Sequence, residues 1–505
     1  MAENANFFLL LQQRFLSADT KACISGPDFP ELSYAELDTL TAQAANLLKE
    51  LGIRPGARVL VQTPKTPLAV VLYLACLRSG AIYVPLNSAY TNEELDYFIQ
   101  DTEPALFVCD PAQSEMLTPL FARHNIPTIL ELAENDSGSL SDRLLGQPTV
   151  HQAVPVDADD IAVIIYTSGT TGKPKGAMLS HGNLSSNALS LYELWDWQSD
   201  DVLIHALPIF HVHGLFVALH LALLGGSSML FLTRFNVEQI LDLIPQASVL
   251  MGVPTFYTRL LQQDALTPEL CKNMRLFISG SAPLLEETFN EFAARSGHRI
   301  LERYGMSETG MLMSNPLHGD RVPGSVGFAL PDVSYRVCDD EGNELDAGSI
   351  GTLQVKGPNV FNGYWRNPEK TRQEFASGYF ITGDLVKIDE QGRASIVGRN
   401  KDLIISGGYN VYPKEIELVL DEQELVQESA VIGVPHPDFG EAVVAVLVPT
   451  SGEKPDPQAL INSLKSQLAS YKVPKKIVVI KELPRNTMGK VQKNLLRDEF
   501  SRLFV

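Results

Sequence analysis

Short apolar segments alternate with helical periodicities over roughly the first 400 residues of the chain. These segments are too short to be helices, and polar residues follow most of them directly. Because buried strands that alternate with helices are typical of parallel sheets, the pattern predicts an α/β protein with largely parallel sheets. The clearest predicted strands are 59–62, 105–108, 161–166, 248–253 and 276–278.

The pattern changes twice towards the C-terminal end. From about 332 to 356 the pattern is that of short alternating strands with an Asp-Glu-Gly-Asn turn, which predicts a small β unit. Near Gly398 the chain starts a new α+β pattern, with helices at 414–420 and 457–468 and strands at 429–434, 442–448 and 477–479. A domain boundary is therefore predicted there, after a large N-terminal α/β domain.

Composition and charge narrow the function classes. The 505 residues carry a formal charge of −20, which disfavours binding to nucleic acid. The five cysteines are scattered without a CxxC pair, so no disulfide framework or zinc site is expected, and a reducing, cytoplasmic location fits best. The N-terminus lacks the basic region of a signal peptide, and the apolar stretch 215–232 is interrupted by His220 and two glycines. We therefore expect buried core there and no membrane span.

Unusual polar segments follow four of the predicted strands. They are TSGTTG after 161–166, PTFYTR after SVLMGV, SGSAP after RLFI, and MSET after RILERYG. Ligands of open α/β sheets bind beyond the carboxyl ends of the strands. If these strands lie side by side, the four segments line one crevice, which is then the candidate active site.

The segment YTSGTTGKPKG, residues 166–176, is suited to binding phosphate. Glycines let backbone N–H groups approach an anion, Ser and Thr hydroxyls add donors, and Lys175 adds positive charge. It is not the P-loop of nucleotide hydrolases, because only two residues separate Gly169 and Gly172 and Pro174 follows Lys173. The residues after it, 176–179, are predicted to form a returning strand. Taken alone, the segment also fits a flexible surface hairpin.

Five motifs in the expected order resemble those of the acyl-adenylate-forming enzymes. They are YTSGTTGKPKG (166–176), YGMSET (304–309), YFITGD (379–384), GRNKD (398–402) and PRNTMGK (484–490). The resemblance implies two N-terminal parallel subdomains with a small β-barrel (1–398), a hinge (399–402) and a mobile C-terminal domain (403–505). It also implies that ATP activates a carboxylate as an acyl-AMP, with Mg²⁺ as cofactor, and that the thiol of coenzyme A then displaces AMP.

The resemblance assigns nucleotide roles to individual residues. Glu308, assisted by Thr167, is expected to hold Mg²⁺, and Ser307 to donate to the α-phosphate. Asp384 is expected to accept both ribose hydroxyls. Taken alone, Glu308 also fits a helix N-terminal carboxylate, and Asp384 a turn residue. The full predicted nucleotide set is Thr167, Ser168, Gly169, Thr170, Thr171, Gly172, Lys175, Gly280, Ser281, Ala282, Glu302, Arg303, Tyr304, Ser307, Asp384, Arg399 and Lys490.

Two lysines of the C-terminal region have roles implied by the resemblance. Lys490 is expected to be the catalytic lysine, whose ammonium screens the two like charges that approach during adenylation. Lys401 is expected to be the hinge about which the smaller domain rotates before coenzyme A reacts. Acetylation of Lys490, by an acetyltransferase reversed by a deacetylase, would remove its charge and is predicted to switch the enzyme off.

The identity of the acid substrate is predicted from the segment that comes after SVLMGV. Arg259 is predicted about one and a half turns into a helix that begins at Pro254, as a fixed cation at the bottom of the acyl cavity. The whole chain resembles bacterial malonyl-CoA synthetases, which implies that Arg259 and Ser281 bind the distal carboxylate of malonate, or of methylmalonate. His211 and Met306 are expected to shape a short pocket. Another short-chain, aryl or dicarboxylic acid, the loading of a carrier protein, and a non-catalytic binding protein of the same fold are the alternatives.

Overall fold

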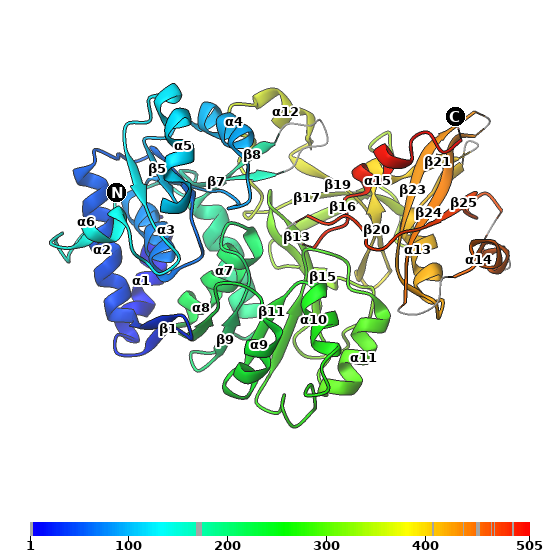
Figure 1. The fold of residues 1–505 in the computed structure, drawn as a ribbon, viewed down its shortest axis with the longest axis horizontal. Helices are drawn as coiled ribbons and strands as arrows, with labels where there is room; N and C mark the ends of the chain where they lie inside the picture. The colour runs from blue at the N-terminus through cyan, green and yellow to red at the C-terminus, as the bar shows by residue number, and fades with distance from the viewer. Residues whose placement is uncertain are drawn as a thin grey trace.

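Figure 1 shows a computed structural model of the chain, which describes residues 4–167, 174–406, 409–437, 439–450, 455–465, 467–468, 470–486 and 489–504. The side chains of residues 409 and 410 lie outside this description. The strands of the described residues form four sheets. A six-stranded and a nine-stranded sheet are largely parallel, and a third sheet, of five strands, is antiparallel. The fourth sheet belongs to the C-terminal part, drawn in orange at the right of Figure 1.

The six-stranded sheet is parallel except for its last strand, because the chain turns back after the phosphate segment. The predicted returning strand is confirmed: Thr167 lies opposite Lys175 in an antiparallel pair. The strand order is β6 (Ile129–Glu131), β5 (Leu106–Cys109), β3 (Arg58–Gln62), β4 (Ile82–Pro85), β7 (Ile161–Thr167) and β8 (Lys175–Ser180).

The nine-stranded sheet is parallel in its centre and antiparallel at both edges. Its central strands are buried along their length, as expected when helices cover both faces of a sheet. The order is β15 (Phe328–Ala329), β14 (Gly310–Ser314), β13 (Leu301–Met306), β12 (Leu276–Ser279), β11 (Val249–Gly252), β9 (Val202–His205), β10 (Ser228–Phe231), β1 (Ala22–Gly26) and β2 (Phe29–Ser33).

The third sheet is the predicted small β unit, and it is antiparallel throughout. Its strands are β16 (Ser334–Cys338), β17 (Ile350–Lys356), β19 (Tyr379–Ile388), β18 (Phe375–Ala376) and β20 (Ala394–Arg399). Asp384 of β19 lies directly opposite Arg399 of β20, so two motifs that are far apart in sequence meet as a cross-strand pair.

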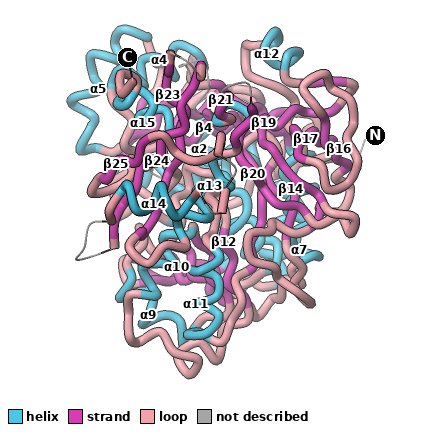
Figure 2. Tube along the Cα trace, turned by 90° about the vertical axis from the view of Figure 1, so that its right-hand side faces the viewer, coloured by secondary structure: helices cyan, strands magenta, loops and turns pink. Residues whose placement is uncertain are grey.

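The C-terminal sheet has its own hydrophobic core on each face. Its strands are β22 (Tyr409–Val411), β21 (Ile404–Ser406), β24 (Gly440–Pro449), β23 (Val426–His436) and β25 (Lys476–Val479). Seen from that end in Figure 2, β23, β24 and β25 lie to one side of β16, β17 and β19. The α+β order predicted for this region is confirmed, and the boundary residues 398, 399, 402 and 403 stay predictions.

The helices start at sequence signals that satisfy their first N–H groups. Capping boxes at Ser33, Thr91 and Ser180 begin α2, α4 and α7, and Pro67 and Pro254 begin α3 and α10. The helices follow here in chain order, with the five just named included. Their bounds are α1 (Phe7–Ser17), α2 (Tyr34–Glu50), α3 (Pro67–Ser79), α4 (Asn92–Thr102), α5 (Pro111–His124), α6 (Ser139–Leu144), α7 (His181–Leu194), α8 (His220–Gly225), α9 (Val237–Leu243), α10 (Pro254–Leu261), α11 (Glu286–Ser296), α12 (Pro368–Gln373), α13 (Pro413–Asp421), α14 (Pro457–Leu464) and α15 (Lys493–Phe500).

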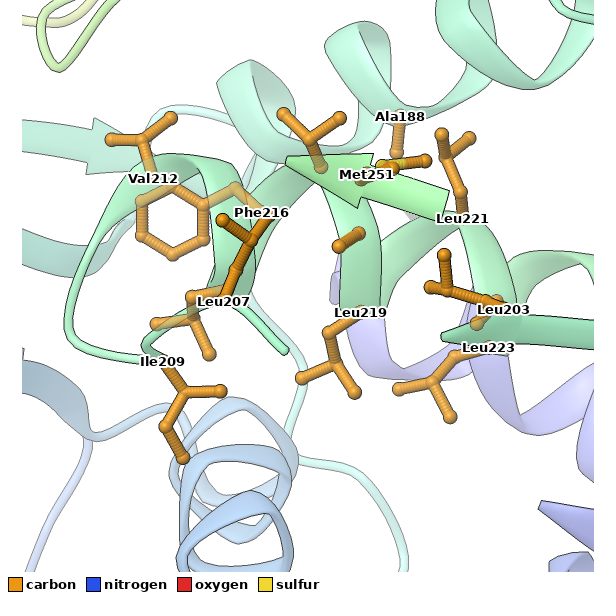
Figure 3. Close-up of a cluster of buried hydrophobic side chains, with 14 of the residues drawn as sticks. Ala188, Leu203, Leu207, Ile209, Val212, Phe216, Leu219, Leu221, Leu223 and Met251 are labelled. Atoms are coloured by element: carbon orange, nitrogen blue, oxygen red, sulfur yellow. The ribbon is translucent and has the colours of Figure 1, made fainter. Parts of the chain in front are cut away.

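A π-helix, η1 (His213–Leu219), lies where the sequence analysis expected buried core, and it runs into α8. Phe216 and Leu219 of η1 pack with Leu203 of β9 and Met251 of β11 in the buried cluster of Figure 3. This core fixes the segment that carries His211 and His213. Within the described residues, no helix is both long and apolar enough to cross a membrane.

Candidate active site

Three of the four predicted polar segments lie side by side at one edge of the nine-stranded sheet. Neighbouring parallel strands place Gly252 of β11 beside Ser279 of β12, and Ser279 beside Glu302 of β13. The fourth segment follows β7 in the other sheet, and the hydroxyl of Thr167 lies 3.4 Å from the carboxylate of Glu308. The predicted convergence is therefore confirmed, and it joins two sheets.

The phosphate end of this crevice is built from groups that partner one another. Glu308 is 6% exposed, and burial raises the pKa of its carboxyl. The Tyr364 hydroxyl lies 3.1 Å from Glu308 Oε1 and also donates to Glu374. Lys175 forms an ion pair with Glu374, with Nζ 2.9 Å from Oε1. Ser168, Gly169, Thr170, Thr171 and Gly172 lie outside the described residues.

Glu374 is ionised in this arrangement. Burial alone would raise the pKa of its carboxyl, but hydrogen bonds from Tyr364, Lys175 and Lys370 lower it below the ordinary value. The sequence analysis did not find Tyr364 or Glu374. Tyr364 and Glu374 are only ten positions apart, but Glu308 and Lys175, which they contact in the crevice, lie 56 and 199 positions away, so no local motif indicates those contacts.

The nucleoside end centres on Asp384, which is 2% exposed. Its two carboxylate oxygens are held by Tyr304, whose hydroxyl lies 2.5 Å from Oδ2, and by Arg399, whose Nε lies 2.8 Å from Oδ1. Ser281 adopts a left-handed backbone with φ +71°, in the turn that follows β12. The predicted ribose residue is thus brought together with Tyr304 and Arg399, and Ala282 follows in the same turn.

The acyl end is different, because buried polar groups there have no partner among the described residues. Arg303 is 3% exposed, and neither its Nε nor its Nη2 is hydrogen-bonded. His213 Nε2 and Ser279 Oγ also have no described partner. The guanidinium lies against Gly280, where a Cβ would come within 2.4 Å of Arg303 Cζ. A larger residue at position 280 would therefore displace this guanidinium.

Electrostatics connect these acyl-end groups. Burial, followed by the positive charges of Arg303 and Lys490, lowers the pKa of His211 to about 4. Burial and Arg303 also lower the pKa of His213 well below its usual value. Burial lowers the pKa of Arg303 itself to about 9, so the guanidinium stays charged at neutral pH although it is poorly solvated. Both histidines are neutral, and the acyl end carries one buried positive charge.

Arg259 differs from the expectation in its burial. It lies on α10 as predicted, and Phe256 and Leu260 of the same helix are buried, but the Arg259 side chain is exposed. Its guanidinium carbon lies 5.6 Å from the ring centre of Phe235. Residue 259 falls at the edge of the buried face of α10, so its side chain extends over Phe235. The buried cation at the acyl end is Arg303, which the sequence analysis had placed with the nucleotide.

Lys490 reaches this crevice from the C-terminal part of the chain. The backbone at Gly489 packs on Thr255 of α10, where a Cβ on Gly489 would lie 3.4 Å from Thr255 Oγ1. Burial lowers the pKa of Lys490 to about 8, with further effects from Arg399 and Asp384. The lysine therefore lies between the nucleoside end and His211. Its acetylation stays a prediction.

Two ion pairs flank the predicted hinge. Arg399 pairs with Asp384 before it, and Asp402 pairs with Arg497 of α15 after it, at 2.8 Å. Asn400 and Lys401 lie between these pairs in a short 3-10 turn, η3 (Asn400–Asp402). The hinge role of Lys401 stays a prediction. Arg497 was not found from the sequence.

The oxygens of Thr167 and Glu308 suit Mg²⁺, a hard cation that takes few protein ligands and completes its shell with water and phosphate oxygens. Among the described residues no group of three or more His, Cys, Asp or Glu side chains could hold a metal ion. The arrangement in the described residues that suits Mg²⁺ is therefore the pair Thr167 and Glu308.

Comparison with known proteins gives consistent matches. Residues 14–365 match the AMP-binding enzyme family, and residues 415–490 match the AMP-binding enzyme C-terminal domain. A malonate–CoA ligase of Arabidopsis thaliana is 36% identical over 483 residues, which cover 88% of this chain and 78% of that protein. The crystal structure of ATP-bound MatB from Rhodopseudomonas palustris is 53% identical and superposes with a TM-score of 0.97 over 100% of both chains. The apo form of the same MatB, also at 53% identity and full coverage of both chains, gives a TM-score of 0.85. The chain therefore superposes more closely on the ATP-bound form than on the apo form.

Proposed function

The chain belongs to the AMP-binding enzyme family, and from that premise we propose that it is a malonate–CoA ligase. It joins malonate to coenzyme A, through malonyl-AMP, and splits ATP into AMP and pyrophosphate. The relative named malonate–CoA ligase, at 36% identity, supports this substrate. The site itself supports it independently.

The buried guanidinium of Arg303, whose Nε and Nη2 have no hydrogen-bond partner among the described residues, is the observation that carries the proposal. Buried charged donors that are left unpaired are unfavourable, so the acyl end is suited to an anion. A monocarboxylic acid cannot supply that anion, because its one carboxylate must reach the α-phosphate of ATP. A diacid supplies both, and its second carboxylate can accept two parallel hydrogen bonds from Arg303.

Hydroxyl and imidazole groups complete this carboxylate pocket. Burial and the nearby charge of Arg303 lower the pKa of His213, whose Nε2 is buried without a described partner, and Ser281 Oγ lies 3.4 Å from His213 Nδ1. Arg259, exposed in the last turn of α10, adds a second cation on the helix whose first turn contacts Gly489 at Thr255. In this assignment Arg303 binds the distal carboxylate, Ser281 and Arg259 assist it, and His211 and Met306 bound a short pocket.

Nucleotide binding uses the other two ends of the crevice. Asp384 accepts the ribose hydroxyls, and Tyr304 flanks the adenine together with Gly280 and Ala282. The phosphate segment, with Lys175, holds the β- and γ-phosphates, and Ser307 donates to the α-phosphate. Thr167 and Glu308 would hold Mg²⁺, which supplies positive charge to the phosphate oxygens when bound.

Adenylation requires positioning and charge stabilisation and no enzyme nucleophile. A malonate carboxylate oxygen forms a bond to the α-phosphorus, and the bond from that phosphorus to the pyrophosphate oxygen breaks. Lys490 lies where the attacking carboxylate and the α-phosphate meet, and its ammonium screens their repulsion. The thiolate of coenzyme A then bonds to the acyl carbon and AMP leaves, after rotation at Lys401 has withdrawn Lys490.

A substrate panel tests the proposed function. Pyrophosphate release and thioester formation are measured with malonate, methylmalonate, succinate, acetate and butyrate at equal concentrations. We expect malonate to exceed acetate and butyrate by about 10⁴-fold in kcat/KM, because those acids leave Arg303 unpaired. Equal turnover of butyrate and malonate would exclude the carboxylate pocket, and no pyrophosphate release with any acid would exclude the adenylating function.

A further inference from the structure

Lys175 is held by a neighbouring acid in the described structure. Its Nζ lies 2.9 Å from Glu374 Oε1 and 4.3 Å from the centre of the Tyr364 ring. The side chains of Lys175 and Glu374 are 12% and 20% exposed, so this ion pair is only partly solvated. Lys175 lies opposite Thr167, which contacts Glu308. The lysine is therefore held at the place where the phosphates of ATP must bind.

Glu374 has more donors than this one lysine. Lys370 Nζ lies 3.0 Å from the same Oε1, and the Tyr364 hydroxyl donates to the other oxygen. When Lys175 leaves, Lys370 and Tyr364 still stabilise the carboxylate. The cost of separating Lys175 from Glu374 is therefore smaller than for an isolated buried pair, in which the acid would be left without a partner.

We propose that Glu374 holds Lys175 in place in the absence of nucleotide and that the β- and γ-phosphates of ATP replace the Glu374 carboxylate on Lys175. Glu374 is in this sense a positioning residue, because it acts through Lys175 and does not touch the reacting atoms. This proposal rests on the proposed function, since it requires ATP phosphates at this end of the site.

Exchange of anions on one lysine has two consequences. The triphosphate binds more weakly than it would to a free lysine, because it must displace a carboxylate. Pyrophosphate, once formed, leaves more easily, because Glu374 takes Lys175 back. AMP has no β- or γ-phosphate, so its binding does not depend on this exchange.

Glu374→Gln is the direct test, because glutamine keeps the size of the side chain and an acceptor for Tyr364 but loses the charge. Dissociation constants for α,β-methylene-ATP, pyrophosphate and AMP are measured by calorimetry. We expect the variant to bind the triphosphate and pyrophosphate about two- to fivefold more tightly, the range that a partly exposed ion pair spans, with AMP unchanged. A purely structural role for Glu374 cannot produce tighter binding.

Three further variants define the mechanism. Glu369→Gln removes the same charge from the same segment at an exposed position, and we expect no change. Lys370→Met leaves Lys175 as the main cation on Glu374, so triphosphate binding should weaken. Lys175→Met should weaken triphosphate binding as well, and adding Glu374→Gln to it should give no gain.

The outcomes separate this inference from the proposed function. If the wild-type protein binds no ATP analogue, both fail. If the wild type binds the analogue but Glu374→Gln leaves its affinity unchanged or weakens it, only the exchange proposal is overturned. Loss of AMP affinity in Glu374→Gln also overturns it, because Glu374 would then support the site as a whole.

Discussion

The phosphate end and the acyl end of the crevice solve opposite problems with buried charge. At the phosphate end the charged groups of the described residues partner one another, since Lys175, Lys370 and Tyr364 all contact Glu374. At the acyl end the guanidinium of Arg303 is buried, and two of its nitrogens have no partner among the described residues.

This difference matches what each end must bind. A triphosphate carries several charges and must leave again as pyrophosphate, so an end that exchanges one anion for another keeps binding reversible. A short diacid must be distinguished from common monoacids, and unpartnered buried donors penalise every ligand that lacks the second carboxylate. In the proposed function, selectivity for the acid is therefore concentrated at the acyl end, and phosphate groups bind and leave at the phosphate end.

The largest expected effect comes from converting the acyl end into an apolar one with Arg303→Met. Methionine fills a similar length without charge, so malonate should lose about 10³- to 10⁴-fold in kcat/KM while the affinity for ATP stays unchanged. Steady-state kinetics with malonate, together with calorimetry of ATP binding, measures both. The ratio of butyrate to malonate turnover should rise in the same variant.

Stability supplies the control for this substitution. Arg303 is poorly solvated in the folded protein, and burial lowers its pKa to about 9, so replacing it removes an unfavourable buried charge. We therefore expect Arg303→Met to melt at the same or a higher temperature without ligand. A variant that loses both malonate activity and thermal stability would show that Arg303 is a structural residue.

A smaller effect is expected for Arg259→Ala, which tests whether the second cation belongs to the acyl end. Because Arg259 is exposed, solvent screens it, and malonate should lose about ten- to 100-fold in kcat/KM with little change for ATP. Lys272→Ala, an exposed cation in the same part of the chain, is the matched control. A loss as large as that of Arg303→Met would show that Arg259 becomes buried when malonate binds.

The fold and most of the site were predictable because they depend on local patterns. Apolar strands with polar segments after them predicted the parallel sheets and the common edge at which Gly252 and Ser279 lie side by side. Motif order brought Asp384 and Arg399 into the same site, and the structure pairs them across two strands.

The remaining features depend on contacts that no local pattern records. Arg303 was included in the predicted nucleotide set and adjoins Tyr304 in the sequence, yet alternate residues of a strand face opposite sides. The Arg303 side chain therefore lies against Gly280, away from Asp384, the partner of Tyr304. Arg259 was expected to be buried because its helix begins at the site, but its position at the edge of the buried face leaves it exposed. Glu374 meets Lys175 across 199 positions of sequence.

Lys490 lies between the nucleoside end and His211 of the acyl end, and the pH dependence of adenylation tests whether its charge is used in the reaction. Burial lowers its pKa from 10.5 to about 8, with Arg399 and Lys401 lowering it further and Asp384 and Asp402 opposing them. The ammonium is charged below pH 8 and loses its proton above it, so adenylation should fall about fivefold between pH 8 and pH 9, as the charged fraction drops from about one half to about one tenth. His211, with a pKa of about 4, is neutral throughout this range and does not contribute.

The measurement must isolate the first half-reaction, because the thiol of coenzyme A titrates in the same range. Malonate-dependent exchange of pyrophosphate into ATP, without coenzyme A, meets this condition. Burial also raises the pKa of Glu302 to about 8 and lowers that of Arg303 to about 9, so a fall in rate above pH 8 has three candidate sources. Lys490→Arg separates the lysine from the other two, because arginine at this position stays charged to high pH. A rate that no longer falls above pH 8 in this variant assigns the titration to Lys490, whereas an unchanged fall assigns it to Glu302 or Arg303 and removes Lys490 from the charge balance of the site.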